Sequence, residues 1–406
     1  MYEIVRKCNP WWDGLVDVDI EKWRGMRVKW IPSWIDKISL KPFSLNFVIG
    51  PRQVGKTTGV KLLIYRLLED GVDPYRIFYF NCDFISDFNY LRRIIDFYFS
   101  FRSSHGFDGD VCYLFFDEIN SVNDWWRVIK GYIDLGAFSR DVIVLTGSSS
   151  LRLRGEVELF PGRRGFGRDV YVYPLSFREF AELFGFKFDL SGDFDRDFIG
   201  LSLYRDDLIR IFDEYVRFGG FPLSINRDPR AEEYFLLGFQ GELLRIGRRI
   251  ELVRSIVSSI FRKAPSPISY STIGRDVGVS YKTVQDYIDV LRCLFILGIA
   301  YFKVDGRIVW RKERKFFVLD PFIARCLSFW VGESFLESAF YEWIVQSHLF
   351  RRFGSVYYFR DRFEIDCIAD GFRVEVKAGK PFRRYPKNVL VIGRDDIPVF
   401  LYALGV

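Results

Sequence analysis

The sequence predicts an α/β fold in which a parallel sheet comes first and smaller helical and α/β segments follow. The pattern Gly-x-x-x-x-Gly-Lys-Thr at residues 50–57 joins an apolar, strand-like run to an amphipathic, helix-like segment. That order of strand, glycine-rich turn and helix is typical of a phosphate-binding loop. Apolar runs and helical segments then alternate as far as residue 173. This alternation predicts a parallel sheet covered by helices on both faces.

Composition bounds the class of protein. The chain has 406 residues, a net charge of +6 and 49% hydrophobic residues, which predicts a globular protein of about two to three domains. Its six cysteines form no C-x-x-C pair and its two histidines stand far apart, so the zinc patterns are excluded and any metal is expected to be Mg²⁺ or Mn²⁺ held by carboxylates. The start lacks a signal-peptide layout and no apolar run is long enough to span a membrane. We therefore expect a cytoplasmic protein without a membrane partner.

Residues 1–44 are rich in tryptophan and lead up to the loop. Such an aromatic segment either packs near the base of a nucleotide or covers an exposed edge of the sheet. The sequence leaves both interpretations open.

The loop itself supplies the groups that phosphates need. Glycines let the backbone curl so that N–H groups face phosphate oxygens, and the following helix adds positive partial charge at its N-terminus. Lys56 is expected to reach the β- and γ-phosphates and Thr57 to bind Mg²⁺. The expected nucleotide-binding residues are Gly50, Pro51, Arg52, Gln53, Val54, Gly55, Lys56, Thr57 and Thr58.

Two acids end a later buried strand. Asp117 follows the apolar run of residues 112–116, where a charged side chain needs a partner, and Mg²⁺ shared with Thr57 is such a partner. Glu118 is then placed to orient or deprotonate an attacking water molecule. The alternative is an acidic pair that caps a helix. The other predicted strands are 45–49, 76–83, 141–148 and 170–173, and the predicted helices between them are 86–102 and 124–135.

Polar residues also follow the next strand. Thr146, Ser148 and Ser149 are placed to sense the γ-phosphate or the attacking water, or else they form a serine-rich helix cap. Arg163 and Arg164 lie in a glycine-rich stretch. Either is a candidate arginine finger acting across a subunit interface, and the alternative is a solvated loop arginine.

Four stretches in this order resemble a known family: GPRQVGKTT at 50–58, LFFDEI at 114–119, LTGSSSL at 145–151 and YPLSFREF at 173–180. They resemble the AAA+-like P-loop ATPases of archaea and bacteria, whose C-terminal half is often a domain of unknown function. The resemblance implies an ATPase core of the additional-strand, catalytic-glutamate class that uses ATP and Mg²⁺. It implies that Lys56, Glu118 and Arg163 are catalytic and that Thr57 and Asp117 hold the metal.

Residues 187–265 are predicted to form a helical lid. An amphipathic helix over 207–218 ends at Gly219-Gly220-Phe221-Pro222, where the glycine suits a C-cap and the proline stops the helix. In related signalling ATPases a proline at this place lies against the nucleotide, so Pro222 is expected to contact it; the alternative is a plain helix breaker. The basic stretch 245–263 is either a solvated helix face or a nucleic-acid contact.

Residues 266–325 predict a winged helix. Helical segments over 269–277 and 281–294 flank a tight turn, and a hairpin follows with Asp305-Gly306 as its turn. In this arrangement Tyr281, Lys282 and Gln285 of the second helix face a DNA major groove. DNA rather than RNA is therefore the expected nucleic acid, although winged helices also serve as packing modules.

Residues 326–406 resemble the PD-(D/E)xK nuclease superfamily. Asp366 lies on one predicted strand and Glu375-x-Lys377 on the next, and the period of a strand puts Glu375 and Lys377 on one face. Together with Glu337 on the preceding helix, they are expected to hold a second Mg²⁺ or Mn²⁺ and to activate water. The alternatives are an ordinary hairpin with surface charges and a nuclease-like fold without activity.

The sequence thus predicts a Mg²⁺-dependent ATPase coupled to nucleic-acid binding or processing. The alternative is a nucleotide-dependent switch whose terminal segments only bind partners, and a third hypothesis is a transcriptional regulator. A homo-oligomer is compatible with an arginine finger. The predicted segments are 1–44 (aromatic), 45–186 (ATPase core), 187–265 (lid), 266–325 (winged helix) and 326–406 (nuclease-like).

Overall fold

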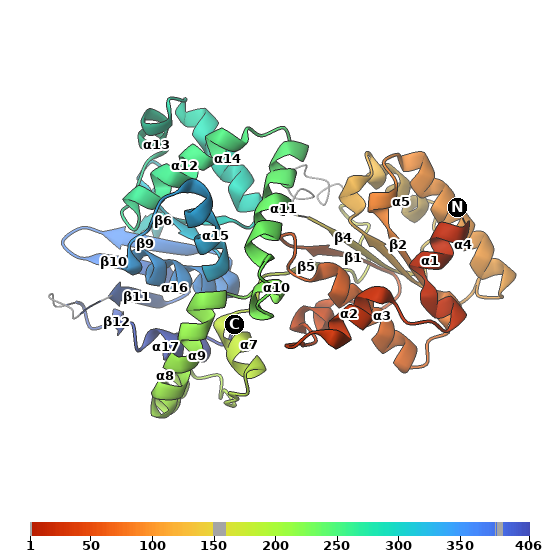
Figure 1. Cartoon of the computed structure of the whole chain (residues 1–406), viewed down its shortest axis with the longest axis horizontal. Coiled ribbons are helices and arrows are strands. Elements are labelled where there is room, and N and C mark those ends of the chain that lie inside the picture. The colour runs from red at the N-terminus through yellow and green to blue at the C-terminus, as the bar shows by residue number, and fades with distance from the viewer. Residues whose placement is uncertain (1, 149–159, 378, 380–384) are drawn as a thin grey trace. The chain divides into compact units, whose positions relative to one another are not determined.

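The computed structural model describes residues 2–148, 160–377, 379 and 385–406. Contacts between Cα atoms divide the chain into two compact units, Met1–Tyr173 and Pro174–Val406. Figure 1 colours the chain from its N-terminus in red to its C-terminus in blue.

The first unit is built on a parallel sheet. In the described part of the chain this sheet has five strands in the order β2-β3-β4-β1-β5, and every neighbouring pair is parallel. The strand β4 lies between β1, which leads into the loop, and β3, which ends in the acids, so the prediction of an additional strand is confirmed. The strands are β1 (Ser44–Ile49), β2 (Ile77–Asn81), β3 (Tyr113–Asp117), β4 (Val142–Gly147) and β5 (Asp169–Tyr171).

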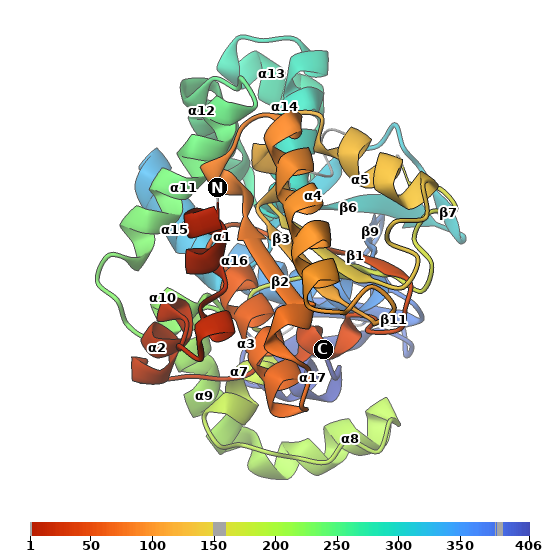
Figure 2. The same ribbon diagram turned by 90° about the vertical axis from the view of Figure 1, so that its right-hand side faces the viewer.

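Helices cover both faces of this sheet, as the alternating pattern predicted. Figure 1 shows α2 and α3 on one side and α5 on the other. Figure 2 shows α4 running in front of β2 and β3, and the ring of Tyr98 on α4 lies 4.6 Å from that of Phe78 on β2. The helices are α1 (Tyr2–Cys8), α2 (Val18–Gly25), α3 (Lys56–Glu69), α4 (Phe88–Ser104) and α5 (Trp125–Asp134), with short 3₁₀ turns η1 (Pro10–Asp13) and η2 (Ser33–Lys37).

The N-terminal segment covers the free edge of the sheet at β2. Asn9 exchanges hydrogen bonds with the backbone of Tyr79, donating to its carbonyl at 2.9 Å and accepting from its N–H at 2.7 Å. The indole N–H groups of Trp11 and Trp12 both donate to the carbonyl of Ile77, at 3.2 and 3.0 Å. Side chains therefore satisfy an edge that would otherwise present unpaired backbone groups.

The second unit begins with helices. The first of them, α7, starts with a capping box, in which Ser176 accepts from the N–H of Glu179 and Glu179 accepts from the N–H of Ser176. The helices before the second sheet are α7 (Phe177–Leu183), α8 (Phe194–Leu201), α9 (Arg205–Phe218), α10 (Pro222–Ile225), α11 (Ala231–Arg245), α12 (Ile250–Lys263), α13 (Tyr270–Val277) and α14 (Tyr281–Cys293).

The helix pair α13–α14 lies within one residue of the predicted bounds. Ser269 and Ser280 each accept a hydrogen bond from the backbone N–H three residues later, which starts the two helices. Gly278 ends α13 with φ at +74°, a conformation that glycine adopts readily. In the described chain no helix is both long and apolar enough to cross a membrane.

A mixed sheet joins the segments predicted as winged helix and nuclease-like. In the described residues it has seven strands in the order β12-β11-β10-β9-β6-β7, with β8 also paired to β6. Because β6 pairs with β7 and β8 on one side and with β9 on the other, the two predicted segments share one sheet. Its strands are β6 (Leu297–Val304), β7 (Arg307–Ile308), β8 (Arg314–Val318), β9 (Val356–Arg360), β10 (Glu364–Ala369), β11 (Phe372–Lys377) and β12 (Leu390–Gly393), and the remaining helices are α15 (Pro321–Val331), α16 (Glu337–Phe353) and α17 (Ile397–Ala403).

Candidate functional site

The glycine-rich loop joins β1 to α3 in a conformation that two of its glycines make possible. A Cβ atom at Gly50 would lie 2.4 Å from the backbone oxygen of Val172, so a larger residue fits only if backbone moves. Gly55 stands just before α3 with φ at +94°, in the left-handed region that favours glycine. The chain thereby turns straight from the strand into the helix, whose first N–H groups are free of helical partners.

Lys56, the first residue of α3, folds back into the loop. Its side chain is 4% exposed and its ammonium lies 3.8 Å from Oε1 of Glu118. The same ammonium donates to the carbonyl oxygens of Gly50 at 3.0 Å and Pro51 at 2.9 Å. The loop therefore fixes a positive charge at the position where a phosphate-binding lysine acts.

Asp117, at the end of β3, is the centre of a hydroxyl network. Its Oδ2 accepts from the hydroxyl of Thr57 at 2.7 Å and from that of Tyr79 at 2.8 Å. Its Oδ1 accepts from the hydroxyl of Thr146, which ends the neighbouring strand β4. The carboxylate is 1% exposed. The structure thus brings together Thr57 and Asp117, the two residues predicted to share a metal.

Glu118 follows with an unusual backbone. Its φ is +49°, a conformation that costs energy outside glycine and is often found at functional sites. Its N–H donates to Thr146 at 3.1 Å. Burial raises the pKa of the Glu118 carboxyl, while the nearby Lys56 opposes that rise. A carboxylate with a raised pKa is a stronger base, as proton abstraction from water requires.

These residues fit a nucleotide with Mg²⁺. The Thr57 hydroxyl and an Asp117 oxygen lie 2.7 Å apart, and both are hard oxygen ligands of the kind that Mg²⁺ binds. Thr57 and Asp117 would hold the metal and Lys56 would contact the phosphates. Bound Mg²⁺ neutralises charge on phosphate oxygens and polarises them.

Sequence analysis missed two members of this site. Tyr79 belongs to an apolar strand of aromatic residues, and no pattern separates it from its neighbours; only the parallel register of β2 and β3 places its hydroxyl beside Asp117. Asn120 exchanges hydrogen bonds with Ser148, accepting from its N–H at 3.1 Å and donating to its hydroxyl at 3.3 Å. Its place two residues after Glu118, just past the end of the same strand, was the signal that could have found it.

The other predicted residues of the first unit are placed differently. Thr146 contacts Asp117 and Ser148 contacts Asn120, while Ser149 lies outside the described residues. The guanidinium of Arg163 is paired with Asp134 at 2.6 Å and that of Arg164 with Asp169 at 2.6 Å. Both pairs lie within the first unit.

In the second unit, the residue predicted to contact the nucleotide and the three predicted to contact DNA lie in the first turns of two helices. Pro222 is the first residue of α10 and follows the C-cap Gly219 of α9. Tyr281, Lys282 and Gln285 are all exposed on α14, whose opposite side is buried. This face of α14 is therefore accessible within its unit.

The predicted nuclease-like residues are only partly brought together. Asp366 lies on β10 and accepts a hydrogen bond from the N–H of Val376 on β11 at 3.0 Å. Glu375, the residue before Val376, accepts a hydrogen bond from the ammonium of Lys377. Glu337 is exposed at the start of α16, where it accepts from the hydroxyl of Tyr341. Among the residues that the structure describes, no three His, Cys, Asp or Glu are grouped so that they could hold a metal ion.

Two residues that the sequence analysis missed take part in this cluster. The ammonium of Lys315 on β8 lies 2.7 Å from Asp366 and 2.9 Å from Glu342 on α16. Burial raises the pKa of the Glu342 carboxyl well above its usual range, and Asp366 adds to that rise. No local pattern identified Lys315, because it is one of four basic residues in the stretch 311–315.

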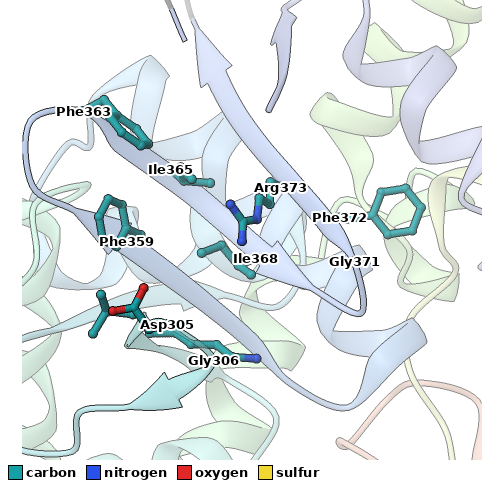
Figure 3. Close-up of a pocket in the computed structure, with 11 residues that line it drawn as sticks. Asp305, Gly306, Phe359, Phe363, Ile365, Ile368, Gly371, Phe372 and Arg373 are labelled. Carbon is teal, nitrogen blue, oxygen red and sulfur yellow. The ribbon is translucent and has the colours of Figure 1, made fainter. Parts of the chain in front are cut away.

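A pocket of about 310 Å³ opens beside the shared sheet. Figure 3 shows Phe359 and Phe363 on one side of it and Arg373 across from them, with the turn residue Asp305 near its rim. Ile365 and Ile368 of β10 both line it because the strand register shifts between them. Asp366 is not among the lining residues, so the pocket is separate from the acidic cluster.

Two family models match parts of the chain. Residues 43–181 match an AAA domain, and residues 209–334 match a domain of unknown function, DUF8612. An uncharacterized protein of Haemophilus influenzae is 26% identical over 297 residues, which covers 69% of this chain and 68% of that protein. An uncharacterized protein of Methanocaldococcus jannaschii is 22% identical over 279 residues, and the match covers 64% of this chain and 57% of that relative.

The solved structures found to be similar are distant from this chain. A RuvB variant of Thermotoga maritima is 18% identical to this chain and superposes with a TM-score of 0.31. The match covers 66% of this chain and 85% of the RuvB chain. The ORC2 protein of Aeropyrum pernix is 11% identical to this chain and superposes with a TM-score of 0.38. The match covers 71% of this chain and 89% of the ORC2 chain. At these scores the likeness carries no argument about function. Residues 43–181, which hold the loop, the acids and the parallel strands, match a P-loop AAA domain, and residues 209–334 match a DUF8612 domain.

Proposed function

We propose that the first unit binds ATP with Mg²⁺ and hydrolyses it. The observation that carries this proposal is the convergence of four side chains at the carboxyl ends of the central strands. Lys56 and Thr57 start α3, and Asp117 and Glu118 end β3, with 2.7 Å between Thr57 and Asp117 and 3.8 Å between Lys56 and Glu118. An α/β sheet binds its ligands at this edge.

Each residue has a distinct role in the proposed reaction. Lys56 contacts the β- and γ-phosphates and stabilises the negative charge of the transition state. Thr57 and Asp117 hold Mg²⁺, and the hydroxyls of Tyr79 and Thr146 hold Asp117 in place. Glu118 takes the proton of the attacking water, which is a role that its raised pKa supports.

Steady-state release of phosphate from ATP tests the proposal with Lys56→Ala. The expected result is loss of turnover, because the change removes the ammonium that Gly50 and Pro51 hold inside the loop. The control is Arg66→Ala on the same helix, where the side chain makes an exposed pair with Asp36; it should keep wild-type turnover. Wild-type turnover in Lys56→Ala would refute the assignment.

We propose further that the second unit couples this ATPase to double-stranded DNA. The exposed face of α14 carries Tyr281, Lys282 and Gln285, and residues 307–312 of the hairpin and its following loop add exposed positive charge. A protein that neutralises several phosphates binds DNA less tightly as salt rises. We therefore expect DNA binding that weakens with salt, and ATP turnover that rises when DNA is added.

The rival proposal is a nucleotide-dependent switch that binds other partners. Lys282→Glu separates the two, because it reverses the charge on the exposed face of α14 without touching the buried face. Loss of DNA binding and of DNA stimulation in this variant, with Lys187→Glu at an exposed position in the loop after α7 as the control, supports the DNA-coupled ATPase. Slow turnover that ignores DNA in the wild type supports the switch.

A further inference from the structure

A buried lysine stands at the centre of the acids of the second sheet. The side chain of Lys315 is 2% exposed, and its ammonium lies 2.7 Å from Asp366, 2.9 Å from Glu342 and 2.8 Å from Glu364. Two of these acids come from β10 and one from α16, so three carboxylates from two elements converge on one nitrogen.

The number of donors matches the number of acceptors. A lysine ammonium has three N–H donors, and each of the three carboxylates lies at the distance of a charge-assisted hydrogen bond. A Mg²⁺ ion binds carboxylate oxygens at about 2.0–2.1 Å. An ion bound among these same oxygens would overlap the nitrogen of Lys315.

Two carboxylate oxygens that Lys315 does not contact have other partners. Oδ2 of Asp366 accepts the N–H of Val376 at 3.0 Å. Oε1 of Glu375 accepts from Lys377 and, at 3.0 Å, from the hydroxyl of Tyr385. Among the described residues, Oε2 of Glu375 and Oε1 of Gln346, whose amide donates to Glu342 at 2.9 Å, are buried without a hydrogen-bond partner. These two oxygens supply only part of the shell of an ion that takes about six ligands.

Lys315 supplies positive charge to the cluster without a metal. Burial opposes the charge of Lys315, but Glu342, Asp366 and Glu364 outweigh burial and hold the pKa of the lysine well above its usual value. Burial and Asp366 raise the pKa of Glu342, so this acid tends to keep a proton. Buried carboxylates need such a partner.

We propose that Lys315 is the resident cation of this cluster and occupies the place that a divalent metal would take. The residues of the sequence-predicted second metal site therefore do not fit a metal in the native protein. The nuclease-like sheet then does not cleave phosphodiester bonds with a metal held at this cluster. This inference does not depend on ATP hydrolysis in the first unit.

The test counts the Mn²⁺ bound by the full chain, from the electron paramagnetic resonance signal of free Mn²⁺ and without nucleotide. Every protein carries Thr57→Ala, so that the loop of the first unit does not contribute. The parent and its Asp366→Asn derivative should bind equal amounts of Mn²⁺, and neither should cut single- or double-stranded DNA in Mn²⁺. Mn²⁺ binding or cleavage that Asp366→Asn abolishes would overturn the proposal.

A second arm removes the lysine. Lys315→Met should gain about one Mn²⁺ per chain, and added Mn²⁺ should raise its unfolding temperature, because the carboxylates lose their cation. Lys303→Met is the matched control on the neighbouring strand β6, where the ammonium lies over the ring of Tyr357 instead; it should gain none. A folded Lys315→Met that binds no more Mn²⁺ than this control overturns the proposal. If Lys315→Met does not fold, Lys315→Met with Glu364→Gln lowers the unbalanced charge, and the Asp366→Asn comparison decides independently.

Discussion

The hydroxyl of Tyr79 should contribute more to the free energy of unfolding than the hydroxyl of an ordinary buried tyrosine. It donates at 2.8 Å to Asp117, and the two residues are 3% and 1% exposed. Tyr79→Phe removes this bond with little change in volume and leaves a buried carboxylate with one donor fewer. Loss of a hydrogen bond to a charged group costs about 1.5–3 kcal/mol.

Tyr98 in the same unit is the matched control. It is also buried, and its hydroxyl donates to an uncharged acceptor, the carbonyl of Tyr75, at 3.1 Å. Such a neutral bond contributes about 0.5–1.5 kcal/mol. In a unit of this size Tyr79→Phe should lower the unfolding temperature by about 7 °C and Tyr98→Phe by about 3 °C.

Thermal unfolding without nucleotide measures both variants. A double-mutant cycle with Asp117→Asn isolates the pair: in that background Tyr79→Phe should cost no more than Tyr98→Phe, because the charge is gone. The reasoning would be refuted if Tyr79→Phe were no worse than Tyr98→Phe in the wild-type background, or if its cost were the same with Asp117→Asn.

Two further predictions follow from the structure. Gly50→Ala places a Cβ atom 2.4 Å from the backbone oxygen of Val172, so it should destabilise the first unit by about 1–3 kcal/mol and weaken ATP binding; calorimetry and thermal unfolding measure both, and unchanged values would contradict the close approach. His348 accepts the N–H of Phe177 at 2.9 Å, and burial lowers its pKa from 6.5 to about 3. Its imidazole signal in nuclear magnetic resonance should therefore not titrate between pH 7 and pH 5, and its contribution to stability should be lost as pH falls from 6.5 toward 3, because only the unfolded chain takes up the proton there. A titration midpoint above 5 would contradict the buried, neutral imidazole.

The parts of the fold that depend on local order were predictable. The loop of residues 50–57 needs a strand before it and a helix after it, and both flanks can be read from short apolar patterns. Asp117 could be found because a charge at the end of a buried strand requires a partner. The helix caps at Ser176, Ser269 and Ser280 follow from the same kind of local chemistry.

Residues that act through long-range contacts were not predictable in this way. Tyr79 and Lys315 donate hydrogen bonds to carboxylates that are 38 and 51 residues away in the sequence. Each stands in a run of similar residues, and the packing of strands and helices decides which residue of that run reaches the carboxylate. On α16 the sequence offered both Glu337 and Glu342. These positions are about 140° apart around the helix, and the sheet that α16 packs against selects the second.

The most direct test of the account is phosphate release and ATP binding in Glu118→Gln. This change keeps the shape of the side chain but removes the base, so the account predicts retained binding of Mg²⁺ and ATP and turnover lower by about 10²–10⁴-fold. Phosphate release at the wild-type rate in Glu118→Gln would contradict the central claim that Lys56, Thr57, Asp117 and Glu118 form an ATP-hydrolysing site.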